Sequence, residues 1–278
     1  MLLVCRFGLP KPAGAPVSQY TFSFSAANHD AGSKTILGQT GNWDAPDAIR
    51  IILSAADASG SLSGRFLARK LWEYFAYYDP PDFVVADLAS AYVSSDHSIR
   101  AMLDALFRHP EFYEAHARGT LVRSPVEYAV AVLRQLQAST DMSAPANNLT
   151  AMGQFLFNPV DAKGWEGRLS WMNTGTVFAR ASFVNGIVNN RGTAGTRIDL
   201  TALLAGHGTA TAADLVAALA DRFGLADAAP QSRAVWEKYA DAKADGTRGY
   251  YQSTPAVLDQ KVRGLVHLML TSPDFHFC

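Results

Sequence analysis

Residues 61–81 read SLSGRFLARKLWEYFAYYDPP, and this stretch decides the expected fold class. Its main apolar residues follow one another at spacings of four, three and four: Leu67, Leu71, Tyr74 and Tyr78. This period is typical of an amphipathic helix with one face in a core, so we expect the aromatic side chains of the stretch to be buried. The prolines at 80 and 81 end the helix, because proline has no backbone N–H to donate.

The same reasoning applied outward predicts helices along most of the chain. The sequence has 45 alanines, 15 of them between residues 201 and 250, and alanine is the best helix former. Asp44 is a candidate N-cap of the first helix, in which Ile49, Ile52 and Leu53 share a face. The expected helices cover about Pro46–Ala56, Ser61–Tyr78, Phe83–Val93, Ser98–Phe107, Pro125–Gln137, Asn147–Phe157, Thr174–Val188, Ala212–Phe223, Gln231–Ala240 and Pro255–Leu270. We therefore predict an all-α protein, a multi-helix globular bundle of about ten helices.

The first 25 residues differ from the rest. Prolines at 10, 12 and 16, with glycines at 8 and 14, exclude a helix there, and residues 19–25 (QYTFSFS) alternate polar and aromatic side chains. We expect residues 1–25 to form an extended, Pro/Gly-rich arm and residues 26–278 to form a single helical domain.

Composition excludes several classes of protein. The 278 residues carry 24 basic and 25 acidic side chains, and a net charge of −1 argues against nucleic acid as a default partner. No run of 18 apolar residues is present, so we expect no membrane span. The two cysteines, Cys5 and Cys278, stand at opposite ends of the sequence, and no common zinc or nucleotide-binding motif occurs. We therefore expect no metal and no cofactor.

Three segments in this order resemble a known family. They are residues 28–41 (NHDAGSKTILGQTG), 65–75 (RFLARKLWEYF) and 163–183 (KGWEGRLSWMNTGTVFARASF). Together with the ending LTSPDFH at 270–276, they are similar to the C-terminal half of the bacterial domain of unknown function 1800 (DUF1800) family, over roughly Tyr20 to Phe277. The resemblance implies a helical fold but no established reaction.

The resemblance also implies a setting. Family members normally have a further N-terminal helical half and often an export signal, neither of which is found here, so the chain is expected to be a truncated or split member. Localisation stays unknown, because the family is often exported to the periplasm or outside the cell but this sequence shows no signal peptide. The family's genes often neighbour one for a sulfatase-like protein, which is a possible partner.

Three groups of residues are candidates for a site. His29 and Asp30 could act as a base and its orienting acid, with Lys34 holding an anion. However, Asp30 could instead cap a turn through backbone hydrogen bonds while His29 anchors the segment. Arg65 and Arg69 share a helix face and could bind a carboxylate, sulfate or phosphate, or form a solvated face in which Arg69 pairs with Glu73.

The third group is the glycine-flanked Trp165 with its neighbours. Lys163, Trp165, Trp171 and Asn173 could bind a sugar polymer by stacking and amide hydrogen bonds. The alternative is a buried plug in which glycines allow close backbone approach and Asn173 caps the next helix.

Two functions remain open from the sequence. The chain is either a non-catalytic binding or accessory module of an exported system, holding a polymer or partner through the Trp165 loop and the Arg65/Arg69 face, or part of a hydrolase-like enzyme that uses His29 and Asp30. No complete nucleophile–base pair or metal motif is present, which favours the binding module. The enzyme hypothesis predicts that the three groups line one pocket, and the binding hypothesis predicts an exposed Trp165.

Overall fold

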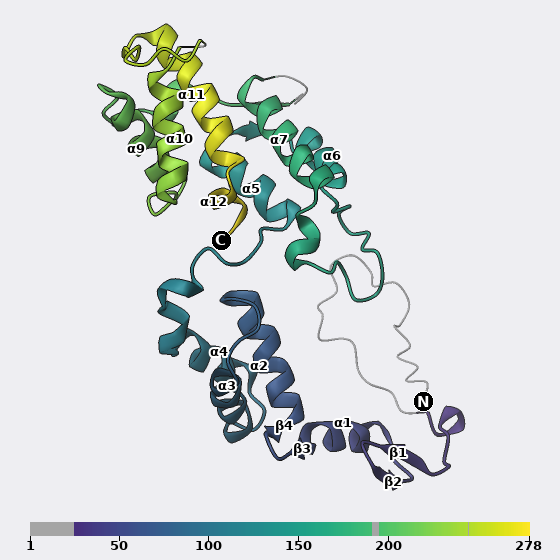
Figure 1. The fold of residues 1–278 in the computed structure, drawn as a ribbon. Coiled ribbons are helices and arrows are strands. Elements are labelled where there is room, and N and C mark those ends of the chain that lie inside the picture. Colours follow the sequence, from purple (N-terminus) through teal and green to yellow (C-terminus); the bar gives the residue numbers. More distant parts are fainter. Residues whose placement is uncertain (1–24, 191–194, 244) are drawn as a thin grey trace. The chain divides into compact units, whose positions relative to one another are not determined.

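A computed structural model describes residues 25–190, 195–243 and 245–278 of the chain. The chain divides into two compact units, Met1–Tyr113 and Glu114–Cys278, which are drawn from purple to blue and from teal to yellow in Figure 1. The described residues are mainly helical, which confirms the predicted fold class. The predicted arm lies outside the described residues apart from Ser25. Where the sequence predicted one helical domain over residues 26–278, the contacts separate two units, and each is described by itself.

Unit 1 begins with small elements. A 3-10 turn, η2 (Ala26–Asn28), leads to an antiparallel hairpin of β1 (Lys34–Ile36) and β2 (Gln39–Gly41), in which Lys34 pairs with Gly41. Helix α1 (Ala45–Ser54) follows, and the predicted N-cap is confirmed because the Asp44 side chain accepts a 2.9 Å hydrogen bond from the Asp47 backbone N–H. A second hairpin, β3 (Ala56–Asp57) with β4 (Gly60–Ser61), connects α1 to the helices that follow.

Three helices form the core of unit 1. They are α2 (Leu62–Phe75), α3 (Asp82–Ser94) and α4 (Ile99–Arg108), and the 3-10 helix η3 (Pro110–Tyr113) follows them. Short connections make successive helices antiparallel, so the C-terminal ends of α2 and α4 lie at the same end of the unit. Buried side chains fill the space between them: Ala68, Trp72, Ala76, Val84, Val85, Leu88, Tyr92, Met102 and Leu106.

The predicted apolar face of α1 is wrong, and that of α2 is only partly right, since Leu67 and Leu71 pack against the core but Tyr74 is exposed. Helix α1 buries Ala48 and Ile51 and leaves Ile49 and Ile52 exposed, and α2 buries Gly64, Ala68 and Trp72. The buried line on α2 has a spacing of four and includes small residues, because α3 packs closely against it. A Cβ added to Gly64 would lie 3.2 Å from the Ala89 Cβ. The aromatic side chains at 66, 74 and 75 therefore remain exposed, although helical spacing predicted buried ones.

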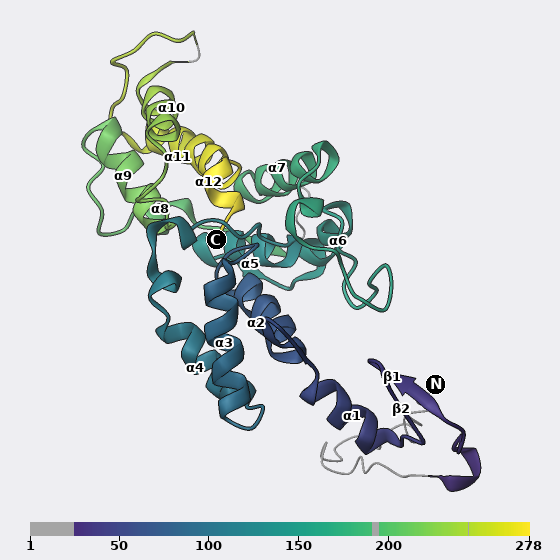
Figure 2. The same cartoon turned by 60° about the horizontal axis from the view of Figure 1, so that its bottom comes forward.

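The described part of unit 2 consists mainly of helices and the segments that connect them. Its elements are η4 (Ala115–Ala117), α5 (Pro125–Gln135), β5 (Ser139–Thr140), α6 (Ser143–Ala151), η5 (Arg168–Trp171), α7 (Thr174–Val188), β6 (Thr196–Arg197), α8 (Leu200–Leu203), α9 (Ala212–Arg222), α10 (Pro230–Asp241), α11 (Pro255–Leu270) and α12 (Pro273–His276). Figure 2 shows α11 between α10 and α7, and α11 buries Val262, Leu265, Val266 and Met269. Strands β5 and β6 pair antiparallel.

Two contacts hold α10 against its neighbours. Helix α11 passes so closely that a Cβ on Gly264 would lie 1.7 Å from the Tyr239 hydroxyl oxygen and 2.2 Å from the ring carbon that bears it. At the other end of α10, the Asp274 side chain accepts a 3.0 Å hydrogen bond from the Ala229 N–H and another from the Ser232 hydroxyl. Both contacts bring segments distant in sequence into one core.

A segment near the start of unit 2 pairs with its last residues. The Leu121 and Cys278 backbones exchange hydrogen bonds of 3.1 and 2.9 Å, and the Arg123 N–H donates to the His276 carbonyl at 2.9 Å. Unit 2 is thus closed by a short antiparallel pairing between residues 121–123 and 276–278.

Candidate functional site

His29 and Asp30 lie in the turn before β1, and Lys34 is the first residue of that strand. Asp30 Oδ1 accepts a 2.8 Å hydrogen bond from the Gly32 N–H, which is the turn-capping alternative. The Lys34 ammonium donates to the carbonyl of Asp30, to that of Gly32 at 3.0 Å and to Asn42 Oδ1 at 3.5 Å. His29 is half-buried and ends η2, where its N–H donates to the Ala26 carbonyl at 3.3 Å. The Asp30 carboxylate and the Lys34 ammonium therefore stabilise the turn through hydrogen bonds to its backbone.

Arg65 and Arg69 each pair with a carboxylate of unit 1. Arg65 Nη1 lies 3.3 and 3.4 Å from the two carboxylate oxygens of Asp57, at the end of β3. Arg69 Nη2 lies 3.6 Å from Asp82, the first residue of α3. Partly exposed pairs of this kind add little stability. In each pair one guanidinium nitrogen faces a carboxylate of the same unit.

Lys163 and Trp165 lie in the loop between α6 and η5. The Lys163 N–H donates to Asp161 Oδ1 at 2.7 Å, and the side chain of Lys163 is exposed. Gly164 and Gly167 have φ angles of 97° and 69°, a region that L-residues with side chains rarely adopt. The glycines thus shape the loop, and the Trp165 side chain is half-buried rather than fully presented.

Trp171 and Asn173 are structural in this geometry. Trp171 is buried, and its carbonyl accepts a 2.9 Å hydrogen bond from the Thr176 hydroxyl. Asn173 is the N-cap of α7, since its Oδ1 accepts the Thr176 N–H at 3.0 Å while the Thr176 hydroxyl accepts the Asn173 N–H at 3.0 Å. The capping alternative for Asn173 accounts for these contacts.

The three predicted groups belong to two units. Residues 29–34 and the two arginines belong to unit 1, whereas Lys163–Asn173 belongs to unit 2. Within unit 1, Asp30 and Lys34 bind groups of the first hairpin and the turns beside it, Arg65 pairs with Asp57 of β3, and Arg69 pairs with Asp82 of α3. A common pocket for all three groups stays a prediction of the enzyme hypothesis.

A buried cationic cluster in unit 2 was not predicted. Arg180 of α7 is fully buried, with Nη2 donating to the Arg123 carbonyl at 2.7 Å and Nη1 3.4 Å from His276 Nδ1. The guanidinium lies 4.8 Å from the centre of the Tyr128 ring, a cation–π distance, and His276 stacks on the same ring at 5.3 Å. The Tyr128 hydroxyl donates to the Leu270 carbonyl at 2.8 Å.

Burial controls the protonation of this cluster. It lowers the pKa of His276 to about 4, with Arg180 and Arg123 adding to the effect, and it lowers the pKa of Arg180. It also raises the pKa of Tyr128. The residues therefore hold α5, α7 and α12 together with a neutral imidazole. The only sequence signal for this role was the LTSPDFH ending itself.

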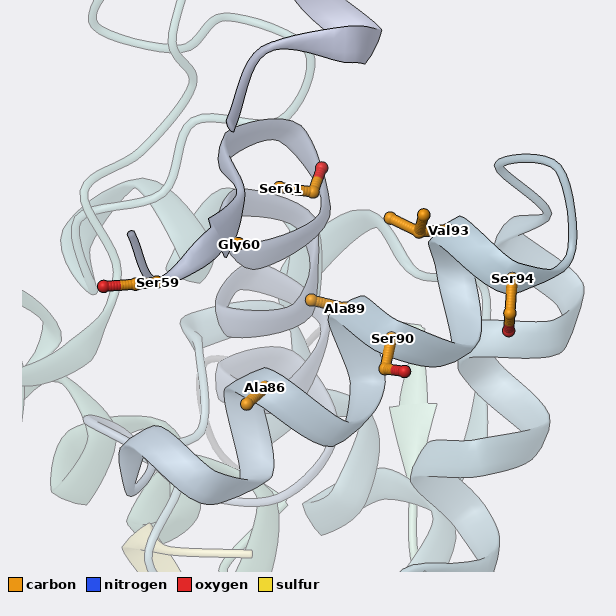
Figure 3. A pocket seen from close by; sticks show the side chains of 8 residues that line it. All are labelled: Ser59, Gly60, Ser61, Ala86, Ala89, Ser90, Val93 and Ser94. Carbon is orange, nitrogen blue, oxygen red and sulfur yellow. The ribbon is translucent and has the colours of Figure 1, made fainter. Parts of the chain in front are cut away.

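A shallow groove in unit 1 has a volume of about 320 Å³ and lies between the β3–β4 hairpin and α3. Figure 3 shows Ala89 and Val93 of α3 facing Gly60 and Ser61. Its lining is small throughout: Ser59, Gly60, Ser61, Ala86, Ala89, Ser90, Val93 and Ser94. The polar side chains of this lining are serine hydroxyls, and no acid or base lines the groove beside them to activate one as a nucleophile.

Residues 25–190, 195–243 and 245–278 contain neither a candidate metal site nor a candidate membrane span. Within these ranges no three His, Cys, Asp or Glu side chains come together as a metal site. None of the described helices is both long and apolar enough to cross a bilayer.

The fold and these contacts define a mainly helical protein of two units whose conspicuous polar residues form turns, caps and ion pairs. The chain belongs to the family described as "Protein of unknown function (DUF1800)", whose model matches residues 9–277. This confirms the family resemblance, and the match starts earlier than the predicted Tyr20 and is not limited to a C-terminal half. No curated protein and no solved structure matches the chain.

Proposed function

We propose that this chain is a non-catalytic binding module that holds a polymer or partner through the loop between Gly153 and Trp171, called here the apolar loop. The observation that carries the proposal is the exposure of large apolar side chains on this loop. Phe157 is 98% exposed and Val160 is 89% exposed, and Phe155 and Leu169 are exposed as well. Isolated exposed apolar residues are common, but several on one loop are typical of an interaction surface.

The backbone of the loop supports the same proposal. Gly164 and Gly167 adopt positive φ angles on either side of Trp165, and the loop is anchored by the buried Trp171 at its end. A loop with a fixed base and exposed apolar side chains can present them at little entropic cost. Lys163 and Trp165 then supply a charge and a half-buried ring beside the apolar residues.

The hydrolase-like alternative has less support. In the turn before β1, Asp30 binds the Gly32 N–H and Lys34 binds two carbonyl oxygens, so neither is held ready for a substrate. Family resemblance adds an exported, accessory setting to the binding proposal.

Co-sedimentation with insoluble polysaccharides tests the polymer ligand. Purified chain is mixed with cellulose, chitin or peptidoglycan, and the bound fraction is compared between wild type and Trp165→Ala, Phe157→Ser and Val235→Ser. Val235 is an exposed apolar residue of α10, outside the apolar loop, and serves as the matched control. We expect a several-fold loss of binding for the two loop variants only. Binding by none of the polymers, or equal loss in the control, would contradict the polymer proposal.

A further inference from the structure

A continuous row of aromatic rings lies at one end of unit 1. Tyr74, Phe75, Phe107, Phe112 and Tyr113, called here the aromatic ladder, contact one another in this order with ring centroids 4.8, 5.1, 5.5 and 5.3 Å apart. They come from the C-terminal ends of α2 and α4 and from η3. The ladder is therefore one connected surface built from three elements.

The ladder is exposed and yet held in place. Tyr74 is 72% exposed and Tyr113 is 62% exposed, and Phe75 and Phe107 are also exposed. Phe112 packs against the core residue Trp72 with ring centroids 6.2 Å apart, and the Tyr113 hydroxyl donates to the Phe107 carbonyl at 2.7 Å. Rings fixed in this way lose little freedom on binding, which is why exposed aromatic side chains often dominate interaction energies.

The ladder lies in an acidic part of the chain. Residues 74–113 contain six acidic residues, at 79, 82, 87, 96, 104 and 111, and two basic ones, at 100 and 108. Two of the acids stand close to ladder residues in the sequence. Asp104 precedes Phe107 and pairs with Arg108, and Glu111 directly precedes Phe112 and accepts a 2.8 Å hydrogen bond from the Tyr77 hydroxyl.

The charge around the ladder and the angles between its rings indicate which kind of ligand it binds. A second copy would bring two surfaces of the same sign together, which costs free energy. A sugar polymer stacks on a shared flat face, but successive rings of the ladder meet at 71° to 89°. A basic amphipathic helix fits both properties, because its apolar side chains pack between edge-to-face rings while its lysines and arginines reach the carboxylates and ring faces.

We propose that the aromatic ladder of unit 1 binds a basic amphipathic helix of a partner protein. The site is separate from the apolar loop of unit 2, so it does not depend on the function proposed above. Binding is stabilised by aromatic burial and weakened by salt, because part of it comes from the net charge of −4 over residues 74–113.

The test uses two designed 18-residue fluorescent peptides. One has leucine at positions i, i+3, i+4 and i+7 and lysine elsewhere, and the other replaces every lysine by glutamate. Fluorescence anisotropy measures their binding to the full chain at 50 and 300 mM salt. We expect the lysine peptide to bind at least tenfold more tightly than the glutamate peptide, and high salt to weaken it severalfold.

Variants locate the binding surface. Tyr74→Ser with Phe107→Ser should weaken the lysine peptide at least tenfold, and Tyr74→Ser alone, at a highly exposed position, should weaken it severalfold with the helical circular dichroism unchanged. Phe178→Ser with Val235→Ser, exposed apolar residues of unit 2, is the matched control and should bind as wild type does. Equal binding of both peptides, equal loss in the control, or a wild-type dimer that the ladder variant dissociates in sedimentation would overturn the proposal.

Discussion

Acidification should weaken unit 2 through His276. The imidazole is only 3% exposed, and its pKa in the folded chain is about 4 against 6.5 for the unperturbed group. Between these two values the unfolded chain binds a proton that the folded chain does not, so stability falls as the pH falls. Above pH 6.5 both states are neutral at this group and the pH has no effect through it. Below pH 4 both are protonated and the loss is complete.

The size of the loss follows from the pKa difference. A difference of one pKa unit corresponds to about 1.4 kcal/mol, so His276 removes about 3 kcal/mol of unfolding free energy between pH 6.5 and pH 4. By pH 5 the loss is already about 2 kcal/mol. This is a large part of the stability of an ordinary domain, which is about 5–15 kcal/mol.

Urea unfolding at pH 7.0, 6.0, 5.0 and 4.5 measures the effect. Helical circular dichroism follows the transitions, and hydrogen exchange of α11 and α12 peptides assigns the one that belongs to unit 2. His276→Gln removes the titrating group, so its stability should depend less on pH than wild type by about 2 kcal/mol at pH 5. His207→Gln, at an exposed histidine, is the control and should follow wild type.

Parallel pH curves for wild type and His276→Gln would refute this reasoning. They would mean that the imidazole reaches solvent or that its contact with Arg180, 3.4 Å away, does not persist in solution. A direct nuclear magnetic resonance titration of His276 in the folded chain gives a second reading. A titration midpoint near pH 6.5 would likewise refute the lowered pKa of His276.

Three further substitutions test the packing of unit 2. Gly264→Ala should lower the free energy of unfolding by about 1–3 kcal/mol, because the added methyl group overlaps the Tyr239 ring. Adding Tyr239→Leu to that variant should restore most of the lost stability. Urea unfolding measures both variants, and an unchanged midpoint for Gly264→Ala would contradict the close approach of the two helices. Asp274→Ala should lower the free energy of unfolding by about 1–3 kcal/mol and speed up hydrogen exchange in the first turn of α10. Unaltered exchange there would mean that the carboxylate does not stabilise that turn. Asn173→Ala should cost about 1 kcal/mol by removing the N-cap of α7, and Asn173→Asp should retain it; equal stability of both variants would count against the capping box.

The sequence predicted helices best where their ends carry explicit signals. The predicted bounds Thr174–Val188 and Pro255–Leu270 agree with α7 and α11, since Asn173 caps one and a proline starts the other. The helix expected over Asn147–Phe157 is instead Ser143–Ala151, because Met142 takes a left-handed φ of 66° at its start and Gly153 takes one of 97° after its end. Such backbone turns leave little trace in hydrophobic periodicity.

Side-chain environment was harder to predict than helix position. On α1 and α2 two apolar faces compete, and which face is buried depends on where α3 and the hairpins pack. The capping alternatives for Asp30 and Asn173 agree with the structure because both rest on local backbone geometry. The Arg180–His276 cluster joins residues 96 apart in sequence, so hydrophobic periodicity could not indicate their contact, and the LTSPDFH ending marked only one of the two.

The pairing of residues 121–123 with 276–278 has a consequence for synthesis on the ribosome. Unit 1 has all of its residues once Tyr113 has left the exit tunnel, so its three helices can pack while translation continues. Unit 2 cannot complete its core until Phe275 and Cys278, the partner of Leu121, have emerged, and Cys278 follows Tyr113 by 165 codons. During that interval the apolar faces of α5 and α7 are not yet buried by α11 and α12. The chain is then most prone to aggregate, and chaperone binding would protect it most at this stage.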